Sequence, residues 1–166
     1  MDILLLEKYA ITTRRSSLYL FESQDFPIIS KEDKESLDVE EGTLIQLHGS
    51  SKKRGKVNVQ VKQFTENKNV LYENMYECNS NCLQVVTQEL WPFVIGIRNK
   101  EKRLALVRRE AEQNWIVNLK INDMVSVPGE CVGVKSSFRF DCIVRYIGMV
   151  PQMNPYGYYF GLELLV

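Results

Sequence analysis

Residues 143–148 read Ile-Val-Arg-Tyr-Ile-Gly, and residues 157–164 read Gly-Tyr-Tyr-Phe-Gly-Leu-Glu-Leu. Aliphatic and aromatic side chains in such runs favour β-strands, and Gly148 and Gly157 bracket the loop between the two segments. Gly161 lies inside the second segment, where a glycine marks a bulge or a close approach of the backbone to another group. The sequence therefore predicts two short, tightly curved strands in its last quarter.

The rest of the sequence repeats this pattern, most clearly at residues 57–61 (VNVQV), where three valines alternate onto one face. Residues 93–97 (FVIGI) form a continuous apolar run that indicates a strand buried on both faces, with Pro92 tolerated at its start. Residues 107–114 fit a short helix. Residues 17–21 fit either a strand or a short helix. Further strands are predicted at residues 43–47, 70–72, 83–87, 104–107, 115–119, 124–127, 138–148 and 158–166. Short strands with frequent turn signals predict a mainly β fold of SH3-like β-barrel units.

Length and composition bound the organisation of the chain. Its 166 residues suit one domain or two small β units, and 21 basic side chains balance 21 acidic ones, so no overall field favours nucleic acid or an anionic membrane. Residues 1–6 lack the cationic start of a signal peptide, and no apolar run approaches the ~20 residues of a membrane span, so we expect a cytoplasmic protein. We predict an N-terminal extension (1–39), a small β-rich domain (40–120) and a C-terminal domain (121–166).

A cluster of aromatic residues falls within fifteen positions of the C-terminal segment, namely Tyr146, Tyr156, Tyr158, Tyr159 and Phe160. In a strand, Tyr158 and Phe160 share one face and Tyr159 takes the other. Rigid aromatic faces with polar tips suit shallow peptide-binding grooves, although large side chains also fill the core of a small barrel. The candidate peptide-binding groove comprises Tyr146, Gly148, Tyr159, Phe160 and Gly161.

A basic loop provides a second candidate surface. Its cationic residues are Lys52, Lys53, Arg54 and Lys56. Clustered cations on a loop are able to contact an acidic partner, whereas the ordinary interpretation is a solvated hairpin tip.

The candidates for metal ligands, or for a nucleophile with its base, are four cysteines and one histidine: Cys78, Cys82, Cys131, Cys142 and His48. Cys78 and Cys82 are spaced C-x3-C, but a structural zinc site usually shows two short ligand pairs. A cysteine nucleophile needs a base within hydrogen-bond reach, and no cysteine lies near His48 in the sequence. Because nucleotide-binding and nucleophile-elbow motifs are also missing from the sequence, we expect free thiols, no catalytic residue, no metal and no cofactor.

The two C-terminal segments resemble the start of a CAP-Gly domain, a small SH3-like β-barrel that binds peptide tails. Residues 143–148 are similar to the family pattern V-V-R-F-I-G, with Tyr146 in place of phenylalanine. Residues 160–164 are similar to V-G-V-E-L, and Tyr159 stands where most members have tryptophan. The resemblance covers about residues 123–166, roughly a quarter of the chain.

The run Tyr-Phe-Gly-Leu-Glu-Leu-Leu looks like the first CAP-Gly domain of cylindromatosis-type (CYLD-like) deubiquitinases. Residues 17–21, 39–46 and 90–106 resemble, in the same order, the segment that precedes that domain. The resemblance implies a parent protein whose C-terminal cysteine protease domain cleaves polyubiquitin and restrains NF-κB-type signalling. None of the motifs of that protease occurs in this sequence, so we do not expect this chain to hydrolyse ubiquitin chains.

The resemblance also implies a non-catalytic interaction module that binds a protein partner, either tubulin in microtubules or a signalling adaptor, with no nucleic acid or membrane. In the family a G-K-N-D-G loop after the Glu-Leu pair holds the partner's tail. The printed sequence ends at Val166 before such a loop, so we expect the CAP-Gly-like domain to be incomplete here. A purely structural β domain that supports the parent protein is the alternative hypothesis, and an enzyme in its own right is a third.

Overall fold

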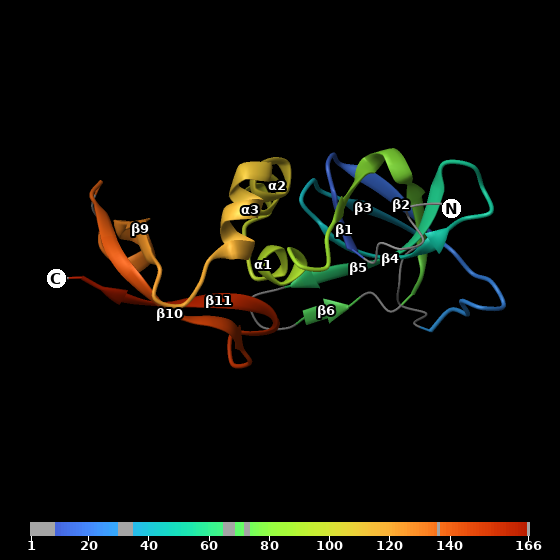
Figure 1. Ribbon diagram of the computed structural model, residues 1–166. Coiled ribbons are helices and arrows are strands. Elements are labelled where there is room, and N and C mark those ends of the chain that lie inside the picture. The colour runs from blue at the N-terminus through green and yellow to red at the C-terminus, as the bar shows by residue number, and fades with distance from the viewer. Residues whose placement is uncertain (1–8, 30–34, 65–68, 72–73, 136, 166) are drawn as a thin grey trace.

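The computed structural model describes residues 9–29, 35–64, 69–71, 74–135 and 137–165. Within these residues, two antiparallel sheets lie toward opposite ends of an elongated molecule, with a group of helices between them (Figure 1). The mainly β prediction is confirmed. No helix in the described part is both long enough and apolar enough to cross a membrane.

The larger sheet has the strand order β3-β2-β7-β5-β4-β1-β8, and β6 pairs with β5. Its strands are β1 (Tyr9–Thr12), β2 (Ser16–Leu20), β3 (Ser36–Val39), β4 (Leu44–Ser50), β5 (Lys56–Phe64), β6 (Asn69–Leu71), β7 (Tyr76–Asn79) and β8 (Leu83–Val86). In the described part no ladder joins the edge strands β3 and β8, so this sheet is open rather than a closed barrel. The described residues of the predicted N-terminal extension, 9–29 and 35–39, contribute β1, β2 and β3 to this sheet.

The alternation of apolar and polar residues along β5 explains the hydrophobic core on one face of the larger sheet, the first core. Val57, Val59 and Val61 are all buried on one face, where they pack with Ile45 and Tyr76. This is the valine face expected from the alternating sequence, and each buried Val, Leu or Ile side chain stabilises the fold by about 1.5–3 kcal/mol.

The strand predictions at residues 93–97, 104–107 and 115–119 are wrong, because residues 93–95, 104–107 and 115–118 lie in helices. The helices are α1 (Trp91–Ile95), α2 (Lys100–Arg108) and α3 (Glu110–Asn118). Pro92 lies in the first turn of α1, where proline is favoured, and Asn99 caps α2 by accepting a hydrogen bond from the Lys102 backbone N–H at 2.9 Å. Short apolar runs do not distinguish a buried strand from a buried helix, so these local signals decide the structure.

The helices cover the outer face of the larger sheet and form a second core. Along β1, Ala10 packs into the first core and Ile11 into the second, so both faces of this strand are buried. Val94 of α1 lies in the same cluster as Ile11, and the Tyr9 and Trp91 rings stack with centroids 4.4 Å apart.

The smaller sheet has the order β11-β10-β9, with β9 (Met124–Pro128), β10 (Arg139–Val150) and β11 (Asn154–Leu164). Among the residues that the structure describes, its core contains three buried ones, Val125, Cys142 and Val144. The sheet follows the turn at residues 119–123, and its strand β11 packs against α1 (Figure 1).

Candidate functional site

Three of the five predicted groove residues meet at one point on the β10–β11 hairpin. Tyr146 of β10 lies opposite Gly161 of β11, and its hydroxyl donates a 2.7 Å hydrogen bond to the Met149 carbonyl oxygen. A Cβ atom added to Gly148 would lie 2.9 Å from Tyr146 Oη, and one added to Gly161 would lie 2.9 Å from Tyr146 Cβ. The two glycines therefore make room for Tyr146, which keeps 46% of its surface exposed.

Tyr159 lies opposite Gly148, so Tyr146 and Tyr159 each face a glycine on the neighbouring strand. Paired residues in a sheet project to the same face, which places Tyr146 and Tyr159 on a common face of the hairpin. Tyr159 is half-buried, and its hydroxyl oxygen is buried with no hydrogen-bond partner in the described part. The side chain of the fifth aromatic residue of the cluster, Tyr156, lies outside the described part.

Phe160 lies on the opposite face and packs against α1. Its ring stacks on Phe93 with centroids 5.8 Å apart, and Tyr158 meets the same ring edge-on at 5.4 Å. The expected division, with Tyr158 and Phe160 on one side of the strand, is therefore present. Gly96 and Gly157 allow this contact, because a Cβ added to Gly157 would lie 2.6 Å from Gly96 Cα.

The basic loop lies at the tip of the β4–β5 hairpin, at the end of the molecule away from β9, β10 and β11 (Figure 1). Lys53 forms a 3.4 Å ion pair with Glu77, and Lys56 lies over the Tyr19 ring at 5.8 Å from its centroid. Lys52 and Arg54 are exposed. The structure does not bring this loop and the aromatic face together into one groove.

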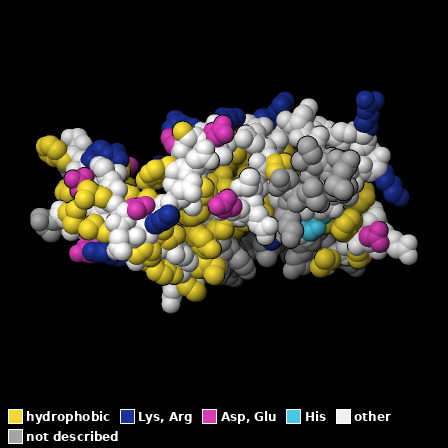
Figure 2. Space-filling view, viewed as in Figure 1, with side chains coloured by type: hydrophobic (Ala, Val, Ile, Leu, Met, Phe, Trp, Pro, Cys, Tyr) yellow, Lys and Arg dark blue, Asp and Glu magenta, His cyan; other side chains and the backbone are white. Residues whose placement is uncertain are grey.

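Exposed apolar side chains concentrate in the C-terminal part of the chain, and Figure 2 shows them gathered over the β10–β11 hairpin. Among the described residues, nine of the thirteen exposed large hydrophobic side chains lie within residues 121–165. They are Ile121, Met124, Val134, Phe138, Tyr146, Met149, Met153, Leu164 and Leu165. Concentrated apolar surface of this kind is typical of protein-interaction sites.

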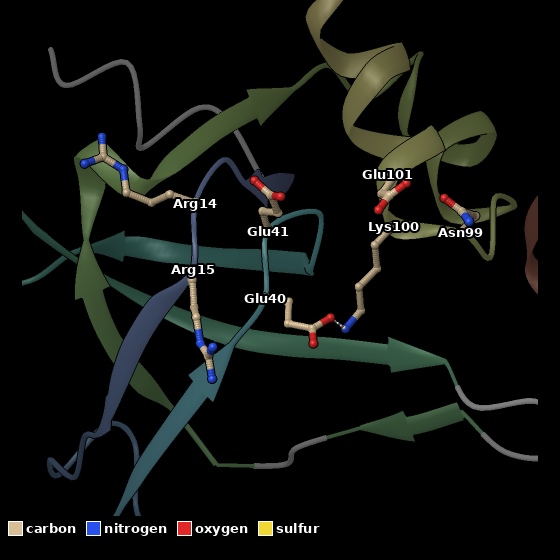
Figure 3. Close-up of a pocket in the computed structure, with 7 residues that line it drawn as sticks. All are labelled: Arg14, Arg15, Glu40, Glu41, Asn99, Lys100 and Glu101. Atoms are coloured by element: carbon tan, nitrogen blue, oxygen red, sulfur yellow. Dashed lines mark hydrogen bonds and ion pairs between the residues drawn. The ribbon is translucent and has the colours of Figure 1, made fainter.

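A charged cleft of about 560 Å³ lies between the larger sheet and the start of α2 (Figure 3). It is lined by Arg14, Arg15, Glu40, Glu41, Asn99, Lys100 and Glu101. Lys100 Nζ donates to Glu40 Oε2 at 3.1 Å, and this contact lowers the pKa of the Glu40 carboxyl. Arg14 points away from Glu40 in Figure 3, whereas the positive charge of Arg15 also contributes to the lowered pKa of the Glu40 carboxyl. Cations and anions here balance one another, so the cleft has no clear preference for a charged ligand.

The cysteines and the histidine are dispersed. Cys78, Cys82 and Cys142 are buried and Cys131 is exposed, and all four are free thiols. Burial raises the pKa of Cys78 to about 12, so this thiol is protonated at neutral pH. His48 Nε2 lies 2.8 Å from Gln60 Oε1, and burial lowers the pKa of its imidazole. Among the described residues, no group of three or more His, Cys, Asp or Glu side chains is placed to hold a metal ion.

Sequence reasoning missed one further surface, an apolar groove between α2 and α3 beside Trp115. Residues 104–107 and 115–119 were predicted as strands and only residues 107–114 as a helix, so the spacing of Lys102, Leu106 and Arg109 along one face of α2 was not recognised. Asn99, a residue that favours the start of a helix, was the sequence signal that would have indicated α2.

Comparison with known proteins adds no relative: no family model, no curated protein and no solved structure matches this chain.

Proposed function

We propose that this chain is a non-catalytic protein-interaction module whose β10–β11 hairpin binds an extended segment of a partner protein. The observation that carries this proposal is the setting of Tyr146. Its ring is exposed, lies against two glycines and is held by the hydrogen bond to the Met149 carbonyl. A side chain that is already held in place loses little conformational entropy when a partner covers it, and tyrosine is enriched at binding hot spots.

The resemblance of residues 143–148 and 157–164 to CAP-Gly segments supports a tail-like partner. On this basis we propose that the chain comes from the N-terminal region of a CYLD-like deubiquitinase, a cytoplasmic protein associated with the cytoskeleton. Tubulin tails and signalling adaptors are then the partner classes, and ubiquitin-chain cleavage belongs to the protease domain of the parent. Because the basic loop lies at the far end of the molecule, we expect the hairpin to bind without it.

Co-sedimentation with microtubules, with and without their acidic tails and at two salt concentrations, tests the tubulin form of this proposal. We expect tail-dependent binding that Tyr146→Ala weakens at least about 10-fold, which corresponds to ~1.4 kcal/mol. Tyr19→Ala is the matched control, because Tyr19 is a similarly exposed tyrosine on the larger sheet. Lys52→Ala with Arg54→Ala should leave binding unchanged. Equal binding by Tyr146→Ala and the wild type would refute the hairpin as the site.

A structural role is the second candidate, and the packing of Tyr158 and Phe160 on Phe93 favours it. In this case the C-terminal sheet would be supported by α1 and would have no partner of its own. Thermal unfolding of Tyr146→Ala separates the two. A loss of about 3–5 kcal/mol, as for a core aromatic, would indicate a structural residue, whereas a small loss with impaired binding would indicate a binding residue.

A further inference from the structure

A groove of about 360 Å³ runs between α2 and α3. Its apolar wall is formed by Ile97, Ala105, Leu106, Trp115 and Ile116. Lys102, Arg109 and Glu112 complete its lining with charged side chains. The volume is within the range of sites that accept a few apolar groups of a ligand or partner.

The apolar side of helix α3 is only partly covered: Ile116 and Val117 pack against the second core, and Trp115 does not. None of its residues is buried, and Trp115 has 57% of its surface exposed. Gln113 holds α3 to α2 by donating from Nε2 to the carbonyl oxygens of Leu106 (2.9 Å) and Val107 (2.7 Å). A nine-residue helix is marginal in isolation, so α3 depends on such contacts while its apolar side remains open to a partner.

We propose that this groove binds one short amphipathic helix of a partner protein that carries an acidic residue on its flank. The dimensions favour a helix, because α2 and α3 have nine residues each and are therefore only about 13.5 Å long. A domain-sized partner usually needs about 800 Å² on each side, whereas a helix inserts two or three apolar side chains into a groove of this length. None of the lining residues belongs to the hairpin surface, so this is a second, separate interaction site.

The charges along the groove explain why the partner helix should carry an acidic residue on its flank. Arg109 Nη1 is paired with Glu112 Oε1 at 2.9 Å, so these two charges largely neutralise one another. Lys102 is exposed and forms no ion pair with any other described residue. It is therefore the cation available to an incoming carboxylate, which would orient the bound helix as well as attract it.

Tryptophan fluorescence provides the readout, because the two tryptophans differ in environment. Trp91 is 7% exposed, whereas Trp115 lies at the groove, so a bound helix should shift the emission of Trp115 alone to the blue. The probe is a synthetic peptide of about 14 residues, or four turns, with leucines at i, i+3, i+4 and i+7 and glutamates on one flank. A scrambled peptide of the same composition and a version with lysines replacing the glutamates are the controls.

We expect saturable binding of the acidic peptide, weakened at least about 10-fold by Lys102→Glu, with the preference reversed toward the lysine peptide. Lys52→Glu changes a distant exposed lysine by the same charge and should have no effect. Thermal unfolding of both variants shows whether they remain folded. Three outcomes would overturn the proposal. The first two are the absence of a saturable shift and equal binding of the scrambled peptide. The third is a blue shift of Trp115 that occurs without peptide and accompanies dimer formation in sedimentation, because a second copy of the chain would then occupy the groove.

Discussion

The larger sheet buries both faces of its strand β1, whereas the described part of the C-terminal sheet has a small core of three buried residues. Ala10 and Ile11 show the first arrangement, since consecutive residues of β1 enter two different cores. Cys142 and Val144 show the second, since the described strands around them carry much exposed apolar surface. Burial supplies most of the free energy of folding, so the comparison assigns stability to the first region and binding surface to the second.

The largest effect should come from the core of the larger sheet. Ile45→Ala removes a fully buried side chain and should lower the free energy of unfolding by about 2–5 kcal/mol, as measured by urea denaturation. Ile121→Ala is the matched change at a half-exposed position of the C-terminal region and should cost about 0.5 kcal/mol or less. Equal losses would remove the distinction between the two regions.

A smaller effect is expected where the two regions meet. Gly157→Ala places a methyl group against the Gly96 backbone and should destabilise the protein by about 1–3 kcal/mol. Hydrogen exchange should accelerate in β10 and β11 more than in β5. Met124→Ala, at an exposed position of the same sheet, should leave exchange unchanged. Uniform acceleration in both sheets would show that they unfold as one unit.

Thiol labelling compares the two sheets directly, because Cys78 lies in β7 and Cys142 in β10 and both are buried. In a Cys131→Ser background, which removes the exposed thiol, we expect Cys142 to react at least about 10-fold faster than Cys78. This ratio corresponds to ~1.4 kcal/mol less free energy for local opening of the C-terminal sheet. Mass spectrometry of the labelled peptides measures both rates, and the reverse order would contradict the comparison.

Alkaline pH should weaken the larger sheet through Cys78. Burial raises the pKa of this thiol from 9.0 to about 12, so the folded state binds its proton more tightly than the unfolded state. The resulting stabilisation is complete below about pH 9 and is lost as the pH rises toward 12. Cys78→Val should therefore flatten the fall in unfolding free energy over this window, by up to about 1.4 kcal/mol per pH unit. An unchanged slope would exclude Cys78 as the cause.

The smallest effects should come from the two hairpin tyrosines, and they should differ in sign. Tyr146→Phe removes the hydrogen bond to the Met149 carbonyl and should cost about 0.5–1 kcal/mol. Tyr159→Phe removes a buried hydroxyl that has no partner in the described part, so stability should stay constant or rise by about 1 kcal/mol. Chemical denaturation of both variants measures the difference, and a clear loss in Tyr159→Phe would reveal a partner for its hydroxyl.

Strict alternation predicted much of the β structure. The valines of β5 and the opposite faces of Tyr158 and Tyr159 follow from a period of two residues, which depends only on the local backbone. The short helix predicted at residues 107–114 overlaps α3. The rest of the helical structure was missed because residues 93–97, 104–107 and 115–119 are short apolar runs that fit either structure.

The candidate site was predictable only in part. The residue types of the hairpin were recognised, but their register was not. Arg145 lies at a shift in register between Val144 and Tyr146, and this shift sets Tyr146 opposite Gly161. The groove beside Trp115 depends on how α3 packs against α2, which is a tertiary contact that no local pattern specifies.

The burial of β1 on both faces also matters while the protein is being synthesised. Strand β1 is synthesised before the other described strands, yet its partners are β4 and β8, and β8 ends at Val86. At about 5–20 residues per second, translation from Thr12 to Val86 takes roughly 4–15 s. During this interval Ile11 has neither the neighbouring strand β8 nor α1 to cover it. A nascent chain of this protein therefore carries, for seconds, a strand β1 that still lacks its second neighbour β8, and such an exposed apolar edge favours aggregation on the ribosome.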